Sequence, residues 1–375
     1  MTDSVPGRGR PAVRAIAPRP EVMLRQAEAL ADDIRTHAGA FDEQVRSLLP
    51  LARLARTESV VVVGDGDSYH AARAVELAFA SLAGVDCRPV SALPFTHYPP
   101  PEASRPPHTV LTIALSASGR TPLVVRAAQQ ARRAGATVVA VTATPASPLT
   151  EAADASLLVG LPGQEPSPGV RTYQASLLGA LLIAVRLGQA RGRLDLDRAD
   201  ALRGELAGLA GAVEETVRAV GGPCRELADR IADAPVLAVL GSGPSYGTAL
   251  YSAAKVIETS AVFAAGQDLE EWCHVERFAR PSDMPVFVVA PPGQSSRHAG
   301  QVVRQAAVLG RRVVAVAPAE DLPGASESWA ELPVHGQVRE EFSPLLYHLY
   351  AAPLACHLAQ RLDRTPFAAG RPSPP

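Results

Sequence analysis

The segment ALYSAAKVIETS, residues 249–260, carries the residues best suited to proton chemistry. Its apolar spacing predicts a helix, on which Tyr251, Lys255 and Glu258 stand at i, i+4 and i+7 and share one face. A glutamate among apolar neighbours has a raised pKa and can serve as a general base. The alternative is a solvated, salt-bridged helix face. Lys255 is the only lysine in a chain with 36 basic residues, which favours the functional interpretation.

A second candidate site is the loop LSASGRTP, residues 115–122, which follows a predicted strand and opens a predicted helix. Free backbone N–H groups at the start of this helix, with the hydroxyls of Ser116, Ser118 and Thr121, would form an anion cradle. The alternative is ordinary Ser/Thr capping beside a glycine turn. The corresponding later segment APPGQSSRHAG lacks the pattern, so only the first loop is expected to bind phosphate.

The third candidate is GQDLEEWCH, residues 266–274. If this segment is helical, Glu271 and His274 are one turn apart, which suits a carboxylate that orients an imidazole. The alternative is a histidine that packs beside Trp272. Cys273 raises the question of a metal, but no second ligand pair follows at a useful spacing, so neither a metal nor another cofactor is expected.

An internal repeat positions these segments. Gly64, Gly66, Ser68 and Tyr69 recur as a G-x-G-x-S-Y pattern 177 residues later, and two VVAV segments at 138 and 313 are 175 residues apart. Each copy is predicted to run strand, glycine turn, helix, strand, turn, helix, strand. Strands that alternate with helices predict right-handed βαβ units in a doubly wound parallel sheet. The predicted strands are 60–63, 109–115 and 137–142 in the first copy and 235–240, 284–290 and 312–317 in the second.

The predicted fold class is therefore α/β, with two tandem doubly wound parallel-sheet domains of a flavodoxin-like or Rossmann-like three-layer αβα kind. Residues 1–20 are expected to form a disordered tail, and 21–193 to hold N-terminal helices and the first domain. Residues 194–222 are expected to be a helical connector, 223–345 the second domain, and 346–375 a C-terminal helix and tail. A helix over 70–83 should stop at Gly84, and 342–362 should form one apolar helix.

Composition excludes several classes of protein. A formal net charge of −2 provides no basic field for nucleic acid or an anionic membrane. The four cysteines are far apart, which indicates neither a disulfide framework nor a structural zinc site. No apolar run suits a signal peptide or a membrane span, so a cytoplasmic protein is expected.

Together these residues resemble the sugar isomerase (SIS) family in its double-domain form, over roughly residues 21–360. That form includes the isomerase half of glucosamine-6-phosphate synthase and the N-acetylglucosamine-6-phosphate dehydratase type. The resemblance implies a sugar-phosphate substrate bound by Ser116, Ser118 and Thr121, although Ala117 replaces a usual glutamine. It also implies a sugar contact at Ser68, in the turn with Gly66.

The same resemblance assigns the catalytic groups. Glu258 matches the base that moves the C2 proton, and Lys255 matches its neighbouring positive charge. His274, sixteen residues after Glu258, matches a ring-opening histidine. In relatives that histidine comes from a second subunit, so a homodimer with a shared active site is expected. Because no glutamine-hydrolysing segment precedes these residues, ammonia-fed synthase activity is not expected.

The chain departs from the family pattern at several positions. Tyr251 replaces a second acidic residue, and Arg171-Thr172-Tyr173 stands where S-T-K is typical, which leaves Arg171 as a predicted substrate ligand. The C-terminal Schiff-base lysine has no counterpart. Arg371 lies near its position, but a guanidinium cannot form an imine.

Three outcomes follow from removing the C2 proton of an open-chain aminosugar 6-phosphate. Expulsion of the C3 hydroxyl, with His274 or Glu271 as the acid, would make the protein a carbon–oxygen lyase that dehydrates N-acetylglucosamine 6-phosphate. This is the preferred prediction. Reprotonation at C1 would give an isomerase or, with a free 2-amino group, a deaminase. An alternative of a different class is a sugar-phosphate sensor without catalysis. The presence of Glu258 and His274 and the lack of a DNA-reading segment argue against it.

Overall fold

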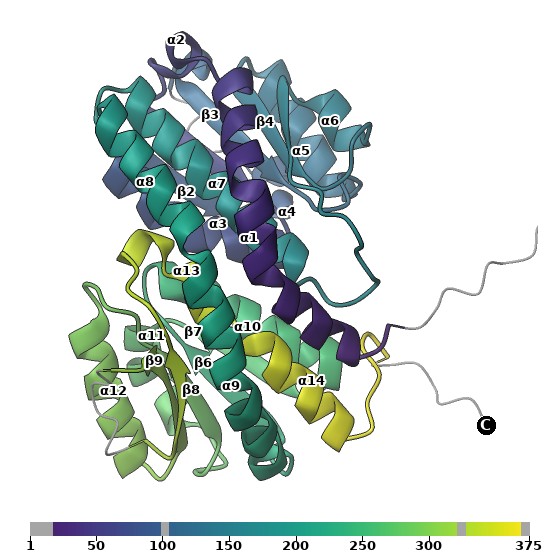
Figure 1. Cartoon of the computed structure of the whole chain (residues 1–375), viewed down its shortest axis with the longest axis vertical. Coiled ribbons are helices and arrows are strands. Elements are labelled where there is room, and N and C mark those ends of the chain that lie inside the picture. The colour runs from purple at the N-terminus through teal and green to yellow at the C-terminus, as the bar shows by residue number, and fades with distance from the viewer. Residues whose placement is uncertain (1–17, 99–104, 321–327, 369–375) are drawn as a thin grey trace, which may run out of the picture.

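Two five-stranded parallel sheets organise the chain in the computed structural model, which describes residues 18–98, 105–320 and 328–368. The strand orders are β2-β1-β3-β4-β5 and β7-β6-β8-β9-β10, so both sheets share one topology. It is the flavodoxin-like order, in which the chain reverses direction across the sheet after the second strand. The predicted pair of doubly wound α/β domains is confirmed. Figure 1 shows the first sheet above the second.

The first sheet forms where short runs of β-branched and apolar residues are buried on both faces, as in Val60–Val63. Its strands are β1 Ser59–Val63, β2 Asp86–Val90, β3 Val110–Leu115, β4 Thr137–Thr142 and β5 Ala155–Leu158. Its connecting helices are α3 Asp67–Ala78 with a following π-helical turn Phe79–Ala83, α4 Ala92–His97, α5 Pro122–Arg133 and α6 Pro148–Ala152, with a 3-10 turn at Pro107–Thr109.

The second sheet repeats this plan. Its strands are β6 Val236–Leu240, β7 Phe263–Gln267, β8 Pro285–Val289, β9 Arg312–Pro318 and β10 Ala330–Val334. Its helices are α10 Pro244–Ser260, α11 Leu269–His274, α12 Ser296–Val308 and α13 Pro344–Tyr347, with 3-10 turns at Glu276–Phe278 and Glu340–Phe342.

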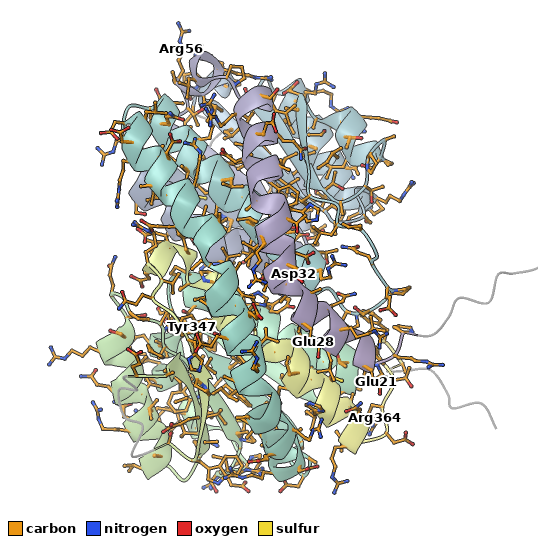
Figure 2. All side chains as sticks on the ribbon, viewed as in Figure 1. Glu21, Glu28, Asp32, Arg56, Tyr347 and Arg364 are labelled. Carbon is orange, nitrogen blue, oxygen red and sulfur yellow. The ribbon has the colours of Figure 1, made fainter. Side chains whose placement is uncertain are left out.

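Helices from the two ends of the chain and from the segment between the two repeats fill the space between and beside the sheets. They are α1 Glu21–Leu48, α2 Leu51–Leu54, α7 Arg171–Ala190, α8 Leu196–Gly208, α9 Ala210–Ile231 and α14 Ala351–Arg361. The long helices α1 and α9 lie side by side across the front of the molecule (Figure 1). Helix α1 is amphipathic: Leu30 and Ile34 are buried in the core shared by both sheets, while Glu28 and Asp32 lie on its exposed face (Figure 2).

Several predicted elements differ from the structure for identifiable reasons. The sequence predicts three strands in each domain, and the four additional ones, β2, β5, β7 and β10, are the edge strands of the two sheets. Edge strands are partly exposed, so they lack a continuous apolar run. The predicted helix 342–362 is split into α13 and α14, and Pro353, which cannot donate a backbone hydrogen bond, lies in the first turn of α14.

Predicted boundaries also move. Helix α3 begins at Asp67, three residues before the expected start, and its π-helical extension ends at Gly84 as predicted, where the φ angle is 63°. The connector does not end at 222, because α9 continues through Pro223 to Ile231. Most of the predicted N-terminal tail (1–17) and residues 369–375, with Arg371, lie outside the described residues. Within the described part, no helix is long and apolar enough to span a bilayer.

Candidate functional site

The carboxyl ends of β1 and β3 define the first site. These strands are neighbours at the point where the sheet order reverses, which is where ligands bind in open α/β sheets. The loop after β1 is a tight turn at Gly66, whose φ angle is 56°. A side chain at Gly64 would meet the Ser68 Cβ atom at 2.6 Å, so this glycine allows Ser68 to fold back beside the strand.

The loop after β3 is the predicted anion cradle. Ser116 and Thr121 join through their hydroxyl oxygens at 3.0 Å, and the Arg120 backbone N–H donates to Ser118 Oγ at 3.2 Å. Thr121 is the N-cap of α5 but makes no side-chain cap, so the first N–H groups of this 12-residue helix point to the loop without an internal acceptor. Three hydroxyls and a helix N-terminus together suit an anion.

Gly119 fixes the shape of this cradle. Its φ angle is 62°, and a Cβ atom there would lie 2.2 Å from Ser147 Oγ and 3.0 Å from Thr142 Oγ1. The loop therefore packs directly on the ends of β4 and α6, and only glycine meets both the angle and the spacing.

Helix α10 of the second domain reaches the same edge of the first sheet. It crosses α3 at Gly247, where a Cβ atom would lie 2.4 Å from the Ala74 backbone nitrogen and 2.6 Å from the His70 carbonyl oxygen. This close crossing brings the last turns of α10 to the start of α3. Lys255 Nζ consequently donates to Asp67 Oδ2 at 2.7 Å and to Glu258 Oε2 at 2.5 Å.

The charges of this triad are strongly coupled. Burial would lower the pKa of Lys255, which has no exposed surface, but the two carboxylates outweigh burial and raise it. Burial opposes ionisation of Asp67, yet Lys255 and His70 hold its pKa below the usual value. The pKa of Glu258 is raised, chiefly by burial and against the attraction of Lys255, with repulsion from Asp67 adding to the effect. A raised carboxylate pKa is what a general base near neutral pH requires.

A cluster of buried aromatic rings packs against the triad, with Lys255 Nζ 5.1 Å from the centroid of the Tyr251 ring. The rings of Tyr251 and Tyr173 stack at 3.7 Å, and the Tyr251 hydroxyl donates to the Gly169 carbonyl at 2.9 Å. His348 packs edge-on against both rings, and burial lowers its pKa to about 3. Buried side-chain atoms without a hydrogen-bond partner in the described part of the chain include Tyr173 Oη, Asp67 Oδ1 and His70 Nδ1.

The structure does not bring His274 to Glu258 within one chain. His274 ends α11 at the carboxyl edge of the second sheet, whereas Glu258 lies in the last turn of α10, with roughly 20 Å of helix between it and Pro244 at that edge. The segment is helical, as predicted, but the expected partner Glu271 is replaced by Glu270, whose Oε1 lies 2.9 Å from His274 Nε2. The spacing i to i+4 brings these two side chains together.

Arg171 has a different environment from the one expected of a substrate ligand. Its guanidinium donates to both oxygens of Asp33, at 2.7 and 2.5 Å, and to the Pro162 carbonyl at 2.8 Å. The bidentate pair is buried and joins α7 to α1. These contacts engage Nε, Nη1 and Nη2 of the guanidinium and give Arg171 a structural role.

The second domain has an equivalent loop with different contents. Strand pairing aligns Gly293 with Gly119 and Gln294 with Arg120. There the Gln294 backbone N–H donates to Glu340 Oε2 at 2.9 Å, and a Cβ atom at Gly293 would lie 2.3 Å from Glu340 Cδ. A carboxylate of the chain itself thus accepts the backbone hydrogen bond at this position of the second loop.

Sequence reasoning missed Asp67, although it identified both neighbours in the turn. A signal was present, because the second repeat has Pro244 where the first has Asp67. An acidic residue that only one copy carries, beside a glycine turn, is a candidate for function rather than for the shared fold.

The comparisons with known proteins agree with this geometry. Residues 53–184 match the family model described as the SIS domain. A glutamine–fructose-6-phosphate aminotransferase (isomerizing) of Streptomyces coelicolor is 28% identical over 310 residues, which cover 80% of this chain and 49% of that protein. The Thermococcus kodakarensis enzyme of the same name is 26% identical over 91% of this chain and 55% of its own length. The chain therefore spans about half the length of these curated relatives.

Solved structures share the whole fold. The C-terminal domain of glucosamine-fructose-6-phosphate aminotransferase from Francisella tularensis superposes with a TM-score of 0.80 at 15% identity, over 92% of this chain and 97% of that one. A glucosamine-6-phosphate deaminase from Thermotoga maritima has a TM-score of 0.69 at 20% identity, over 93% and 98% of the two chains. Residues 53–184 therefore form a SIS domain, and the chain as a whole resembles the isomerase domain of glutamine–fructose-6-phosphate aminotransferase.

Proposed function

We propose that this protein is an enzyme that removes the C2 proton of an open-chain 2-amino- or 2-acetamido-hexose 6-phosphate, with Glu258 as the base. The observation that carries the proposal is the Asp67–Lys255–Glu258 triad beside an anion cradle at the reversal point of the first sheet. Many folds offer one of these features. This chemistry needs a carboxylate of raised pKa close to a loop that can bind a phosphate.

The cradle formed by Ser116, Ser118 and Thr121 at the start of α5 binds the 6-phosphate. With the phosphate fixed there, the sugar chain extends along the β1 loop, past Ser68, toward Glu258. Tyr173 Oη, which is buried and makes no hydrogen bond in the described part of the chain, is available to bond a polar group of the substrate.

Lys255 acts as a positioning residue. It is fully buried and donates to both carboxylates, so it holds Glu258 in one orientation and keeps enough negative charge on it to accept a proton. The open-chain C1 aldehyde acidifies the C2 hydrogen. Glu258 takes that proton, and the electron pair moves toward the C1 oxygen.

For the next step we favour dehydration of N-acetylglucosamine 6-phosphate. The C2 electron pair forms a C2=C3 double bond, the C3–O bond breaks, and the hydroxyl leaves as water with a proton from His274 or Glu271 of a second copy. The supporting observation is that the sole lysine is buried between two carboxylates, where it cannot form an imine with a ketose. The isomerase or deaminase outcome is the second candidate, supported by the names of the relatives, and a non-catalytic sensor is the third.

We also propose that the active form is a homodimer. Glu258 and His274 lie at opposite edges of the second sheet in one chain, so His274 can reach Glu258 only from another copy. Mixing two inactive variants, Glu258→Gln and His274→Ala, tests this directly. Random pairing places one intact site in half of the dimers, so activity should return to about one quarter of the wild-type value. No recovery after subunit exchange would contradict the shared site.

The product decides among the three candidate functions. Purified protein is incubated separately with N-acetylglucosamine 6-phosphate and with glucosamine 6-phosphate, and the products are identified by mass spectrometry and NMR. Loss of one water from the acetylated sugar supports the lyase, and fructose 6-phosphate with ammonia from the free amine supports the deaminase. Unchanged but bound sugar supports the sensor. Glu258→Gln is the matched control and should abolish either conversion.

A further inference from the structure

We propose that Glu270, Cys273 and His298 form a binding site for a zinc-class divalent cation at the carboxyl edge of the second sheet. Glu270 and Cys273 lie on α11, and His298 lies in the first turn of α12. One ligand atom from each residue, two oxygen or nitrogen donors and one sulfur, falls within 4.8 Å of the other two. This cluster is separate from the Asp67–Lys255–Glu258 triad.

The spacing of the ligand atoms suits a single metal ion. Glu270 Oε2 and His298 Nε2 are 2.9 Å apart. Two atoms at this separation, each about 2.0–2.2 Å from a zinc ion, subtend an angle of about 90° at the metal. Opening that angle to a tetrahedral one moves the atoms apart by a few tenths of an ångström, which a side-chain rotation supplies.

The neutral imidazole of His298 presents a lone pair to this position. Its Nδ1 lies 3.2 Å from Gln301 Oε1, which can only accept, so Nδ1 carries a hydrogen and, in the neutral ring, Nε2 carries the lone pair. Nε2 is buried and makes no hydrogen bond within the described residues, although the Glu270 carboxylate is adjacent. Two electron-rich atoms this close require a cation between them, either a proton or a metal ion.

Neighbouring side chains contact the other two ligands, as outer-shell groups do at known metal sites. His274 Nε2 holds Glu270 Oε1 at 2.9 Å, which leaves Oε2 directed at the cluster. The Cys273 thiol donates to Gln305 Oε1 at 3.7 Å, one turn along α12 from Gln301, and gives up this hydrogen when it binds a metal ion as the thiolate. Glu270 and His298 therefore each have a partner that fixes their direction.

The donor set selects the class of metal. A thiolate, an imidazole and a carboxylate suit Zn²⁺ and Co²⁺, whereas Mg²⁺ and Ca²⁺ prefer oxygen ligands. Three protein ligands leave a fourth position, and the Glu270 side chain is more than half exposed, so water or a small anion can reach it. The sequence did not indicate this site because His298 is 25 residues away from Cys273 and no motif links them.

Cobalt titration of the full chain tests the proposal without relying on catalysis. The untagged, chelator-treated protein is titrated with Co²⁺ and followed by near-ultraviolet and visible absorption, and Zn²⁺ is then added in competition. We expect about one ion per chain, a thiolate-to-cobalt charge-transfer band, and its displacement by zinc.

Matched variants make the assignment specific. Cys273→Ser should remove the charge-transfer band, while Cys87→Ser, a change in strand β2 of the other domain, should leave it intact. Gln301→Ala, which removes only the partner of His298, should weaken binding by about 10- to 100-fold. Absence of saturable binding would overturn the site and leave the Glu270–His298 contact as an ordinary ion pair. A band that survives in Cys273→Ser would also overturn it, because the thiolate ligand would then be another cysteine.

Discussion

Two substitutions in the triad should move the pH dependence of turnover in opposite directions. Glu258 has to be ionised to accept a proton, so the rate falls as the pH drops through its pKa. Asp67→Asn removes a negative charge that raises the pKa of Glu258, and the acid limb should move to lower pH. Lys255→Met removes the ammonium group that lowers this pKa, and the limb should move to higher pH.

The size of the effect follows from the geometry. Asp67 and Glu258 both contact one nitrogen, at 2.7 and 2.5 Å, so their nearest oxygens are separated by at most about 5 Å. At an effective dielectric constant of about 20, their repulsion is about 3 kcal/mol, and partial exposure of both side chains reduces it to roughly 1–2 kcal/mol. Lys255 is nearer to Glu258 than Asp67 is, so the methionine variant should show the larger displacement.

The assay is kcat/KM against pH for the sugar phosphate that the wild-type protein converts, because this ratio reports the free enzyme. Thermal unfolding is the control for both variants. In Asp67→Asn the amide oxygen would still offer Lys255 Nζ an acceptor, whereas Lys255→Met leaves two carboxylates unpaired and should cost up to about 3–5 kcal/mol of folding free energy. If Lys255→Met fails to fold, the direction in which the acid limb of kcat/KM moves in Asp67→Asn tests the electrostatic account by itself. The electrostatic account of the triad would be refuted if the acid limb moved in the same direction in both variants. It would also be refuted if the acid limb of Asp67→Asn stayed at the wild-type pH.

Three further predictions concern the cradle, a buried ion pair and a buried histidine. Ser118→Ala should raise KM for phosphorylated sugars with little change in kcat, and steady-state kinetics with an unchanged KM would exclude the cradle. Arg171→Met should lower the free energy of unfolding by about 3–5 kcal/mol, because it leaves Asp33 buried and unpaired, and denaturant unfolding measures this. His348 has a pKa of about 3 in the folded protein, so stability should fall as the pH drops from about 6.5 toward 3, and His348→Gln should flatten that part of the plot of melting temperature against pH.

The sequence predicted the parts of the fold that depend on local pattern. The internal repeat identified two domains, and continuous apolar runs located the central strands of both sheets. The edge strands were not predicted, because a partly exposed strand such as β2, DCRPV, has no apolar run to distinguish it from a loop. The split between α13 and α14 was not predicted, because segment 342–362 is apolar enough throughout to suggest one continuous helix.

The candidate site could be assembled only in part. Spacing along one helix placed Lys255 and Glu258 together, and the loop pattern marked the cradle. Asp67 joins them across 188 residues of chain through the crossing of α3 and α10, which no spacing rule describes. Arg171 could not be assigned from sequence either, since its partner Asp33 lies on a helix 138 residues earlier.

The crossing of α3 and α10 also explains why one chain should hold one working site. Each of these helices packs on its own sheet and, near its far end, contacts a residue that follows a strand of the other repeat: Lys255 contacts Asp67, and Ser81 contacts Glu341. At the end of α3, the position equivalent to Glu258 is Ser81, whose hydroxyl donates to Glu341 at 2.8 Å. An unactivated hydroxyl is a poor base, and the anion position of that second site already holds Glu340. In the proposed site, the first sheet therefore provides the cradle, while the second repeat contributes the helix that carries Glu258, the proposed base.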